Sequence, residues 1–296
     1  MKKLCIVLLL LAQPSLVFSK DYVKDKTTGC QIWTVAATSA TWSGGCVNGK
    51  ANGKGTAMMY KDGVLLGTYI GALTDGKQNG KAIFTFADGT RYEGEFKDGK
   101  LHGRGMRTFL DGSRYEGEFR DNQGNGQGVY TFRDGSRYEG QFKDSWRNGQ
   151  GVLISANGTR YEGLFKDDKE NGQGVQTMKN GSRFEGQFKN GKRNGQGVYT
   201  FPDGSSYKGP FKDDQRNGQG VLTYANGSHY EGQFRDDKRH GRGVMTYADG
   251  SRYAGQFKND KRQGQGVMTY PNGSRYEGQY KDDLENGPGK FKTKSK

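Results

Sequence analysis

Histidine, cysteine, proline and aliphatic side chains are all scarce in this sequence. Its 296 residues include three histidines, three cysteines and five prolines, and only 31% of them are hydrophobic. So small an apolar content cannot fill the core of a compact globule of this length. Beyond residue 19, no stretch carries the period of about 3.6 residues that marks an amphipathic helix, which argues against a helical array.

The scarcity of histidine and cysteine also argues against catalysis and metal binding. His102, His229 and His240 have no acid or nucleophile beside them in a context that differs from the rest of the chain. Cys30 and Cys46 have no histidine near them and therefore make no zinc set. We expect no catalytic residue, no metal site and no cofactor.

Glycine and aromatic residues are abundant, and they recur at fixed places. The chain has 50 glycines, 17 tyrosines and 16 phenylalanines, more rings than disordered chains usually contain. The phrase YEGEFKDGKLHGRGMRTFLDGSR fills residues 92–114, and YEGEFRDNQGNGQGVYTFRDGSR follows it directly. Units of 23 residues start at Tyr69, Tyr92, Tyr115, Tyr138, Tyr161, Phe184, Tyr207, Tyr230, Tyr253 and Tyr276. So strict a period indicates a repeat array.

Each unit has the pattern of two β-strands joined by turns. In RYEGEF (91–96), Tyr92 and Phe96 alternate with the glutamates and would lie on the opposite face. A turn is expected at KDGK (97–100) and another at RDGS (133–136), whose Asp-Gly pair is typical of a hairpin because both residues tolerate positive φ. The sequence therefore predicts an all-β fold, an elongated single-layer antiparallel meander of 23-residue hairpins.

Glycine recurs where rings are expected to lie close to the backbone. A side chain at Gly94 would collide with the flanking Tyr92 and Phe96, and Gly103 and Gly105 are expected to let rings lie flat on bare backbone. Stacked ring pairs add about 0.5–1.5 kcal/mol each beyond area burial. The expected structural ladder consists of Tyr92, Phe96, Tyr115, Phe119, Tyr138, Phe142, Tyr161, Phe165, Phe184, Phe188, Tyr207, Phe211, Tyr230, Phe234, Tyr253, Phe257, Tyr276 and Tyr280.

The repeated unit resembles the MORN (membrane occupation and recognition nexus) repeat. The resemblance rests on YEGEFKDGKLHGRG (92–105), YEGQFKDSWRNGQG (138–151) and YEGQFRDDKRHGRG (230–243), and it extends over residues 69–289. This chain departs from the family pattern at Phe96 and its equivalents, where Trp is usual, at Ala254, where Glu is usual, and at Pro210, which lacks a ladder donor. The resemblance implies an elongated single-layer sheet that serves interaction or scaffolding, and some members have been credited with binding acidic phospholipids.

The first residues look like a secretory signal peptide. A basic stretch at residues 1–3 precedes the apolar run LCIVLLLLAQPSLVF (4–18), and cleavage is expected after Ser19. An uncleaved membrane anchor is the alternative. In an exported protein Cys30 and Cys46 would form a disulfide, whereas in a cytosolic protein they would stay free thiols. We expect an exported bacterial protein that is periplasmic, on the cell surface or secreted.

Four segments follow from these patterns. They are a signal peptide at 1–19, a head at 20–68 with the disulfide and one degenerate repeat at 42–55, ten repeats at 69–289 with the last one truncated, and a basic tail at 290–296. The head and the truncated last repeat would cap the array.

The charge pattern leaves two interpretations open. The chain has 46 basic and 32 acidic residues, a net charge of +14. One basic column comprises Arg91, Arg114, Arg137, Arg160, Arg183, Arg252 and Arg275, and a second begins at Lys97. Glutamates two residues from most of these arginines suggest a solvated, cross-paired face. The alternative is a binding surface for anionic lipid, acidic glycan or an acidic protein.

Three functions are compatible with these observations. The first is a non-enzymatic scaffold that binds a protein through a ring-lined groove or an open sheet edge, and this is the function that we expect. The second is peripheral attachment to anionic membrane lipid or acidic glycan through the basic columns. The third is an enzyme with a site in the head, for which the sequence nominates no residue. Nucleic acid is not an expected partner, and end-to-end pairing of two copies stays open.

Overall fold

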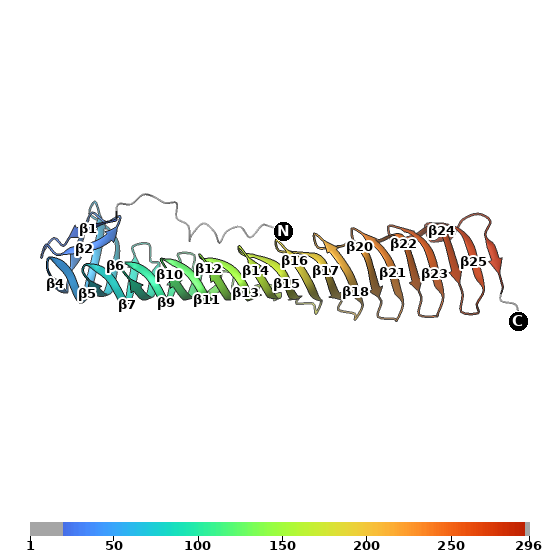
Figure 1. The fold of residues 1–296 in the computed structure, drawn as a ribbon, viewed down its shortest axis with the longest axis horizontal. Coiled ribbons are helices and arrows are strands. Elements are labelled where there is room, and N and C mark those ends of the chain that lie inside the picture. The colour runs from blue at the N-terminus through green and yellow to red at the C-terminus, as the bar shows by residue number, and fades with distance from the viewer. Residues whose placement is uncertain (1–19, 294–296) are drawn as a thin grey trace. The chain divides into compact units, whose positions relative to one another are not determined.

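The computed structural model of this chain describes residues 20–293. These residues form two compact units, one ending at Ala156 and one beginning at Asn157. The predicted signal peptide at 1–19 lies outside the described residues, as do the last three residues of the predicted basic tail. Residues 20–293 contain strands, turns and loops but no helix (Figure 1).

The first unit consists of a head followed by repeats. Its strands are β1 (Lys20–Lys24), β2 (Gln31–Val35), β3 (Ser39–Trp42), β4 (Gly45–Val47), β5 (Lys50–Lys61), β6 (Val64–Thr74), β7 (Lys77–Phe86), β8 (Arg91–Lys97), β9 (Lys100–Thr108), β10 (Arg114–Arg120), β11 (Gln123–Thr131), β12 (Arg137–Lys143) and β13 (Trp146–Ile154). From β5 to β13 each strand pairs antiparallel with the next one in the chain. This unit is therefore a meander.

The second unit continues the same pattern. Its strands are β14 (Arg160–Lys166), β15 (Lys169–Thr177), β16 (Arg183–Lys189), β17 (Lys192–Thr200), β18 (Ser206–Lys212), β19 (Gln215–Arg216), β20 (Gly218–Thr223), β21 (His229–Arg235), β22 (Lys238–Thr246), β23 (Arg252–Lys258), β24 (Lys261–Thr269), β25 (Arg275–Lys281), β26 (Leu284–Glu285) and β27 (Lys290–Lys292). Because both units are antiparallel meanders of 23-residue hairpins, the predicted all-β fold class is confirmed.

The head is held by the predicted disulfide. Cys30 and Cys46 are bonded, and they join the segment before β2 to β4. A closed loop of this length is worth about 3 kcal/mol in the chain-entropy model. Asp25, which is 2% exposed, accepts hydrogen bonds from the backbone N of Thr28 at 2.6 Å and of Trp42 at 3.2 Å. Burial opposes ionisation of this carboxyl, but the hydrogen bonds outweigh it and lower its pKa.

The two connections of each repeat differ in geometry. Between β8 and β9, Asp98 and Gly99 form a two-residue turn with φ of 49° and 78°, the positive values that suit the strand twist. Between β11 and β12, the loop spans the five residues 132–136, and only Gly135 there has a positive φ, 85°. The predicted turn at RDGS is therefore present, and Asp134 does not use the positive φ that it tolerates. Its side chain instead accepts a hydrogen bond from Ser136 N at 2.9 Å.

Pro210 weakens strand pairing on one side only. It stands opposite Gln196 in the pair β17–β18, which runs unbroken from Ser206 to Phe211. On the other side the partner is interrupted at Asn217 and is split into β19 and β20. Asn217 N still donates to Pro210 O at 3.0 Å. A carbonyl that can accept, beside a nitrogen that cannot donate, explains this partial pairing.

Candidate binding groove on the polar face

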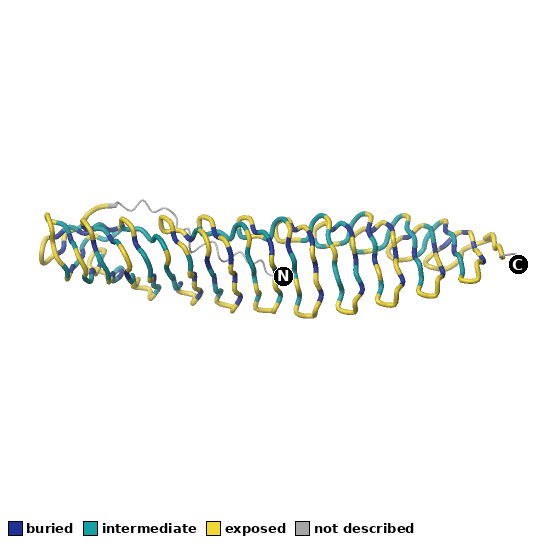
Figure 2. Tube along the Cα trace, turned by 60° about the horizontal axis from the view of Figure 1, so that its bottom comes forward, coloured by how far each residue is buried: buried dark blue, intermediate teal, exposed yellow. Residues whose placement is uncertain are grey.

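The predicted ring ladder is the core of each unit and not an open surface. The Tyr92 ring centroid lies 5.1 Å from that of Phe96 in its own strand and 5.1 Å from that of Phe119 in the next repeat, edge-on in both pairs. Tyr92 has no exposed surface, and all the ladder residues named above are buried. In Figure 2 buried and exposed residues alternate along the strands. The hypothesis of a ring-lined binding groove is therefore wrong, because a partner cannot reach these rings.

Each ladder tyrosine lies over glycines of its own hairpin. A Cβ added at Gly94 would come within 2.5 Å of both Tyr92 Oη and Gly105 Cα, so only glycine leaves room for the ring. Burial raises the pKa of Tyr207 and of Tyr253 to about 12. The folded state therefore favours the neutral, protonated form of these two tyrosines.

A second set of glycines serves a β-bulge that sequence reasoning missed. The register between β12 and β13 shifts in mid-strand, and Gly149 there adopts a φ of 80°. Gln141 Oε1 accepts a hydrogen bond from Gln150 N at 3.0 Å, which satisfies a donor beside the bulge. Gly103 is the counterpart of Gly149, with a φ of 59° and its space taken by Glu95. Its expected role as a seat for a ring is therefore wrong.

A second arginine column, also missed, joins neighbouring repeats on the ring side. Arg239 Nε lies 3.3 Å from Asp260 Oδ1 in the next turn, and its guanidinium lies 5.7 Å from the Tyr230 ring and 5.3 Å from the Phe257 ring. We call this arrangement the arginine clasp. It recurs as Arg193–Asp214, Arg216–Asp237 and Arg262–Asp283. The run DDKR (236–239) is the sequence signal that marks it.

The predicted basic column lies on the opposite, polar face, and most of its charge is neutralised. Five of its arginines form ion pairs with a glutamate two residues later in the same strand: Arg91–Glu93, Arg114–Glu116, Arg137–Glu139, Arg160–Glu162 and Arg183–Glu185, with N–O distances of 2.6–2.8 Å. Arg252 and Arg275 form no ion pair within residues 20–293. The cross-paired interpretation of this face therefore fits five of the seven positions.

The polar face presents parallel rows of side chains across the strands. One row alternates carboxylates and aliphatic side chains, since Glu116 stands opposite Met106 on one side and Val129 on the other. A second row holds glutamines such as Gln127, which faces Gln141. Neighbouring strands are about 4.8 Å apart, so each type of side chain recurs every 10 Å or so. We call this face the polar groove.

Two hollows open in the polar groove at equivalent repeat positions. The first, of about 590 Å³, lies in the first unit and is lined by Glu93, Arg104, Gly105, Met106, Glu116, Gly117, Glu118, Gln127, Gly128, Val129 and Glu139. The second, of about 620 Å³, lies in the second unit and is lined by Gln219, Glu231, Arg242, Gly243, Val244, Ala254, Gly255, Gln256, Gln265, Gly266, Val267 and Glu277. Apart from Gln219, each lining residue of the second hollow lies 138 residues, or six repeats, beyond one in the first. Arg104 and Arg242 occupy equivalent places in their two repeats, and most other repeats have glutamine at that place.

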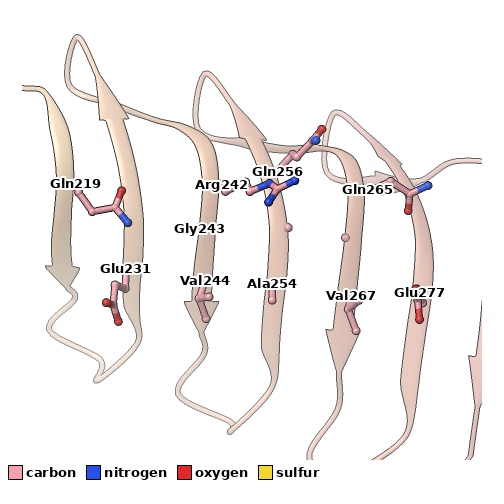
Figure 3. A pocket seen from close by; sticks show the side chains of 12 residues that line it. Gln219, Glu231, Arg242, Gly243, Val244, Ala254, Gln256, Gln265, Val267 and Glu277 are labelled. Carbon is pink, nitrogen blue, oxygen red and sulfur yellow. The ribbon is translucent and has the colours of Figure 1, made fainter.

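The second hollow has an apolar floor. Val244, Ala254 and Val267 are direct neighbours across β22, β23 and β24, and Figure 3 shows them in one row between Glu231 and Glu277. In the first hollow the centre of the row is Glu116, paired with Arg114 at 2.8 Å. The centre of the row is therefore uncharged at Ala254, a departure already visible in the sequence, where its counterpart carries an ion pair, and the two hollows have similar volumes.

The remaining predicted residues are placed as follows. His102 lies in β9 and His240 in β22, both half-buried in equivalent positions, and His229 is exposed in β21. Across residues 20–293 no group of three or more His, Cys, Asp or Glu side chains is placed to hold a metal ion. In the same part of the chain no helix is long and apolar enough to cross a membrane.

The fold and the groove define a β-hairpin repeat protein with an open polar face. The family model described as MORN repeat matches residues 69–91, 92–114, 115–137, 138–160, 161–183, 184–206, 207–229, 230–252, 253–275 and 276–295. The chain therefore belongs to the MORN-repeat family.

Solved structures with a similar course of the chain include centriolar-protein domains. The TCP10 domain of Danio rerio CPAP, in complex with a peptide of Danio rerio STIL, is 16% identical, with a TM-score of 0.43 over 74% of this chain and 95% of that one. The G-box domain of the microcephaly protein CPAP is 14% identical, with a TM-score of 0.41 over 65% of this chain and 100% of that one. Likenesses at this level carry no conclusion about function. No curated protein sequence matches the chain.

Proposed function

We propose that this protein is a non-enzymatic scaffold that binds an extended segment of a partner protein along its polar groove. The observation that carries the proposal is the pair of hollows in that groove, at equivalent places six repeats apart. The ladder rings cannot serve, because they are buried in the core. The polar groove is open, and its carboxylate, aliphatic and amide groups are those that peptide recognition uses.

The periodicity of the groove supports a polymeric and extended ligand. Equivalent side chains recur every 10 Å or so, about the span of three residues of an extended chain. A segment lying along the groove would meet the same set of groups at each repeat. Contacts that are weak one at a time would then add along its length.

We propose that the scaffold works after export from a bacterial cell, in the envelope or outside it. Support comes from the apolar run at residues 4–18 and from the Cys30–Cys46 disulfide, because disulfides persist in oxidising compartments. Fractionation of the producing cells tests the setting. Recovery of the chain with reduced thiols from the cytosol would contradict it.

Attachment to anionic lipid or acidic glycan is the second candidate function. Its support is the net charge of +14 and the exposed lysines near the hairpin turns, of which Lys97 and Lys143 are examples. The ion-paired arginines weaken this candidate, since five of the seven named positions already hold a carboxylate. Binding to acidic vesicles that falls steeply between low and physiological salt would support it.

Site-specific photo-crosslinking in the producing cells tests the scaffold function. A crosslinker in place of Val129 or Val244 would sit in the two hollows, and one in place of Leu110, which is 69% exposed on a connecting loop, is the matched control. We expect discrete protein adducts at the groove positions that survive a high-salt wash. Equal adduct formation at Leu110, or none at either groove position, would remove the proposal.

A further inference from the structure

Five charges that have no ion-pair partner within residues 20–293 surround the second hollow. Glu231 and Glu277 stand at the two ends of its row, Arg242 stands on one flank, and Arg252 and Arg275 stand on the other. All five side chains are exposed, and no hydrogen bond or ion pair joins any of them to another described residue. Exposed carboxylates and guanidinium groups that lie close together can bind a ligand whose charges are arranged in the opposite way.

Ala254 accounts for one of these unpaired charges, that of Arg252. Seven of the ten repeats have glutamate at its place, and five of those glutamates pair with the arginine two residues earlier. Alanine there leaves Arg252 without a carboxylate and makes the centre of the floor apolar. The opening at this point is a local departure from the repeat, and the backbone register across it is unchanged.

We propose that this hollow binds a seven-residue extended segment of a partner protein, with a basic residue at each end and aliphatic residues at the third and fifth places. The inference rests on the proposed scaffold function and names the chemistry of its ligand. The two end residues would pair with Glu231 and Glu277. The two aliphatic side chains would lie on Val244, Ala254 and Val267.

The spacing of the groove matches this segment. Four strand spacings of about 4.8 Å put Glu231 and Glu277 about 19 Å apart. In an extended chain, side chains that point the same way recur about every 6.8 Å, so the first and seventh residues are about 20 Å apart. The third and fifth residues then fall on either side of Ala254, at the middle of the floor. Arg242 and Arg252, on the flanks, are placed to donate to main-chain carbonyls of the bound segment.

The signs of the charges favour such a segment over a polyanion. A lipid surface or an acidic glycan would bring negative groups against Glu231 and Glu277 as well as against the arginines. A peptide with separated basic side chains and neutral central residues meets both signs correctly. Its aliphatic side chains also remove the apolar floor from water.

Fluorescence anisotropy with the full chain and a capped synthetic heptapeptide tests the inference. The peptide carries lysine at both ends, valine at the third and fifth places and serine elsewhere, and a scrambled peptide with adjacent lysines is the reference. We expect the first peptide to bind and Ala254→Glu to weaken it at least about tenfold, the loss expected when one aliphatic side chain is no longer buried. Ala248→Glu adds the same charge on an exposed loop outside the hollow and should leave binding unchanged.

Each result of this experiment decides something. Because glutamate occupies the equivalent place in neighbouring repeats, the Ala254→Glu chain should keep its thermal transition, which circular dichroism checks. Equal binding of the two peptides, or binding that Ala254→Glu leaves intact, would overturn the inference, as would binding of acidic vesicles that Ala254→Glu abolishes. If the Ala254→Glu chain no longer binds the peptide but still forms partner adducts at Val129, the scaffold function is supported independently of the peptide site.

Discussion

The two hollows share their backbone and differ in a few side chains. Both are walled by an arginine, Arg104 in the first and Arg242 in the second. The first is filled at its centre by Glu116, which Arg114 neutralises, and its end glutamates are paired as well. The second has Ala254 at its centre and unpaired charges around it. The same repeat backbone therefore carries either a neutralised surface or one with unpaired charges around an apolar centre.

This difference shows where function resides in a periodic protein. The repeated residues build the strands, turns and ring ladder, and they are the same beside both hollows. The distinguishing groups lie where the chain departs from its own pattern. In such an array, the odd residues deserve more weight than the recurrent ones when a binding site is sought.

The arginine clasp marks a second contrast between the regions. Beside the second hollow, Arg239 and Arg262 hold the next turn and cover the rings. The equivalent places beside the first hollow are occupied by Leu101 and Gly124, which carry no charge. The second region therefore has the better-supported core beneath a less neutralised surface.

The largest effect is expected at alkaline pH, where the two regions should fail together. Burial raises the pKa of Tyr253, beside the second hollow, to about 12, and it also raises the pKa of Tyr115, beside the first. The stability this gives is complete below the ordinary pKa of about 10 and is lost as the pH rises through the folded-state values. We expect cooperative unfolding between pH 10 and 12, followed by tyrosinate absorbance and circular dichroism. Survival of one region alone would contradict the claim that both regions depend on the same kind of buried ring ladder.

Next in size is the effect of a side chain beneath a ladder ring. A Cβ at Gly255 would lie 2.6 Å from Tyr253 Cζ, and one at Gly117 would lie 2.7 Å from Tyr115 Oη. Gly255→Val and Gly117→Val should each cost about 2–3 kcal/mol of unfolding free energy in their own unit. Hydrogen exchange measured unit by unit checks this. Gln265→Val, beside the glycines but directed into the groove, should cost far less.

A smaller effect on stability is expected when Arg239 of the clasp is replaced by leucine, the residue at the equivalent place, Leu101, in the first region. Arg239→Leu removes the bonds from the guanidinium to Asp260, one of which is a contact of 2.6 Å from Nη2 to the backbone O. It also removes the contact with the Tyr230 ring. We expect a loss of about 1–2 kcal/mol, measured by denaturant unfolding. An unchanged midpoint would mean that the clasp contributes nothing to the contrast.

The smallest effect on stability is expected when the first hollow is opened. Glu116→Ala removes an ion pair whose side chains are 50% and 60% exposed, so the unfolding free energy should change by less than about 0.5 kcal/mol. The variant should bind the heptapeptide more weakly than the native second hollow does, because Glu93 and Glu139 remain paired. Anisotropy with Ala254→Glu as background isolates this site. Binding as strong as at the second hollow would show that the central residue alone decides.

The sequence was sufficient for the strands and their faces but not for the conformations between them. Alternation of Tyr92 and Phe96 with glutamates predicted which side chains are buried, because strand geometry has a period of two. The role of Gly103 was assigned wrongly, and the length of the loop around Asp134 was not foreseen, since a bulge and a loop length depend on the register of two strands and not on one dipeptide. The clasp was missed because its partners, such as Arg239 and Asp260, meet only after neighbouring hairpins pair. Ala254 is visible in the sequence as a departure from the repeat, but its place between Val244 and Val267 becomes known only from the strand register.

The seating of each tyrosine on the glycines of its own hairpin has a consequence for how the array can change in length. A hairpin brings its own ring and its own seat, so a whole 23-residue unit can be inserted or removed while the remaining hairpins still find matching neighbours. A deletion of 22 or 24 residues would instead send every following side chain to the wrong face. Insertion or removal of whole units would thus give longer or shorter chains whose hairpins still pair, and Ala254 would move together with Val267 but apart from Val244 and Glu277, which belong to the neighbouring units.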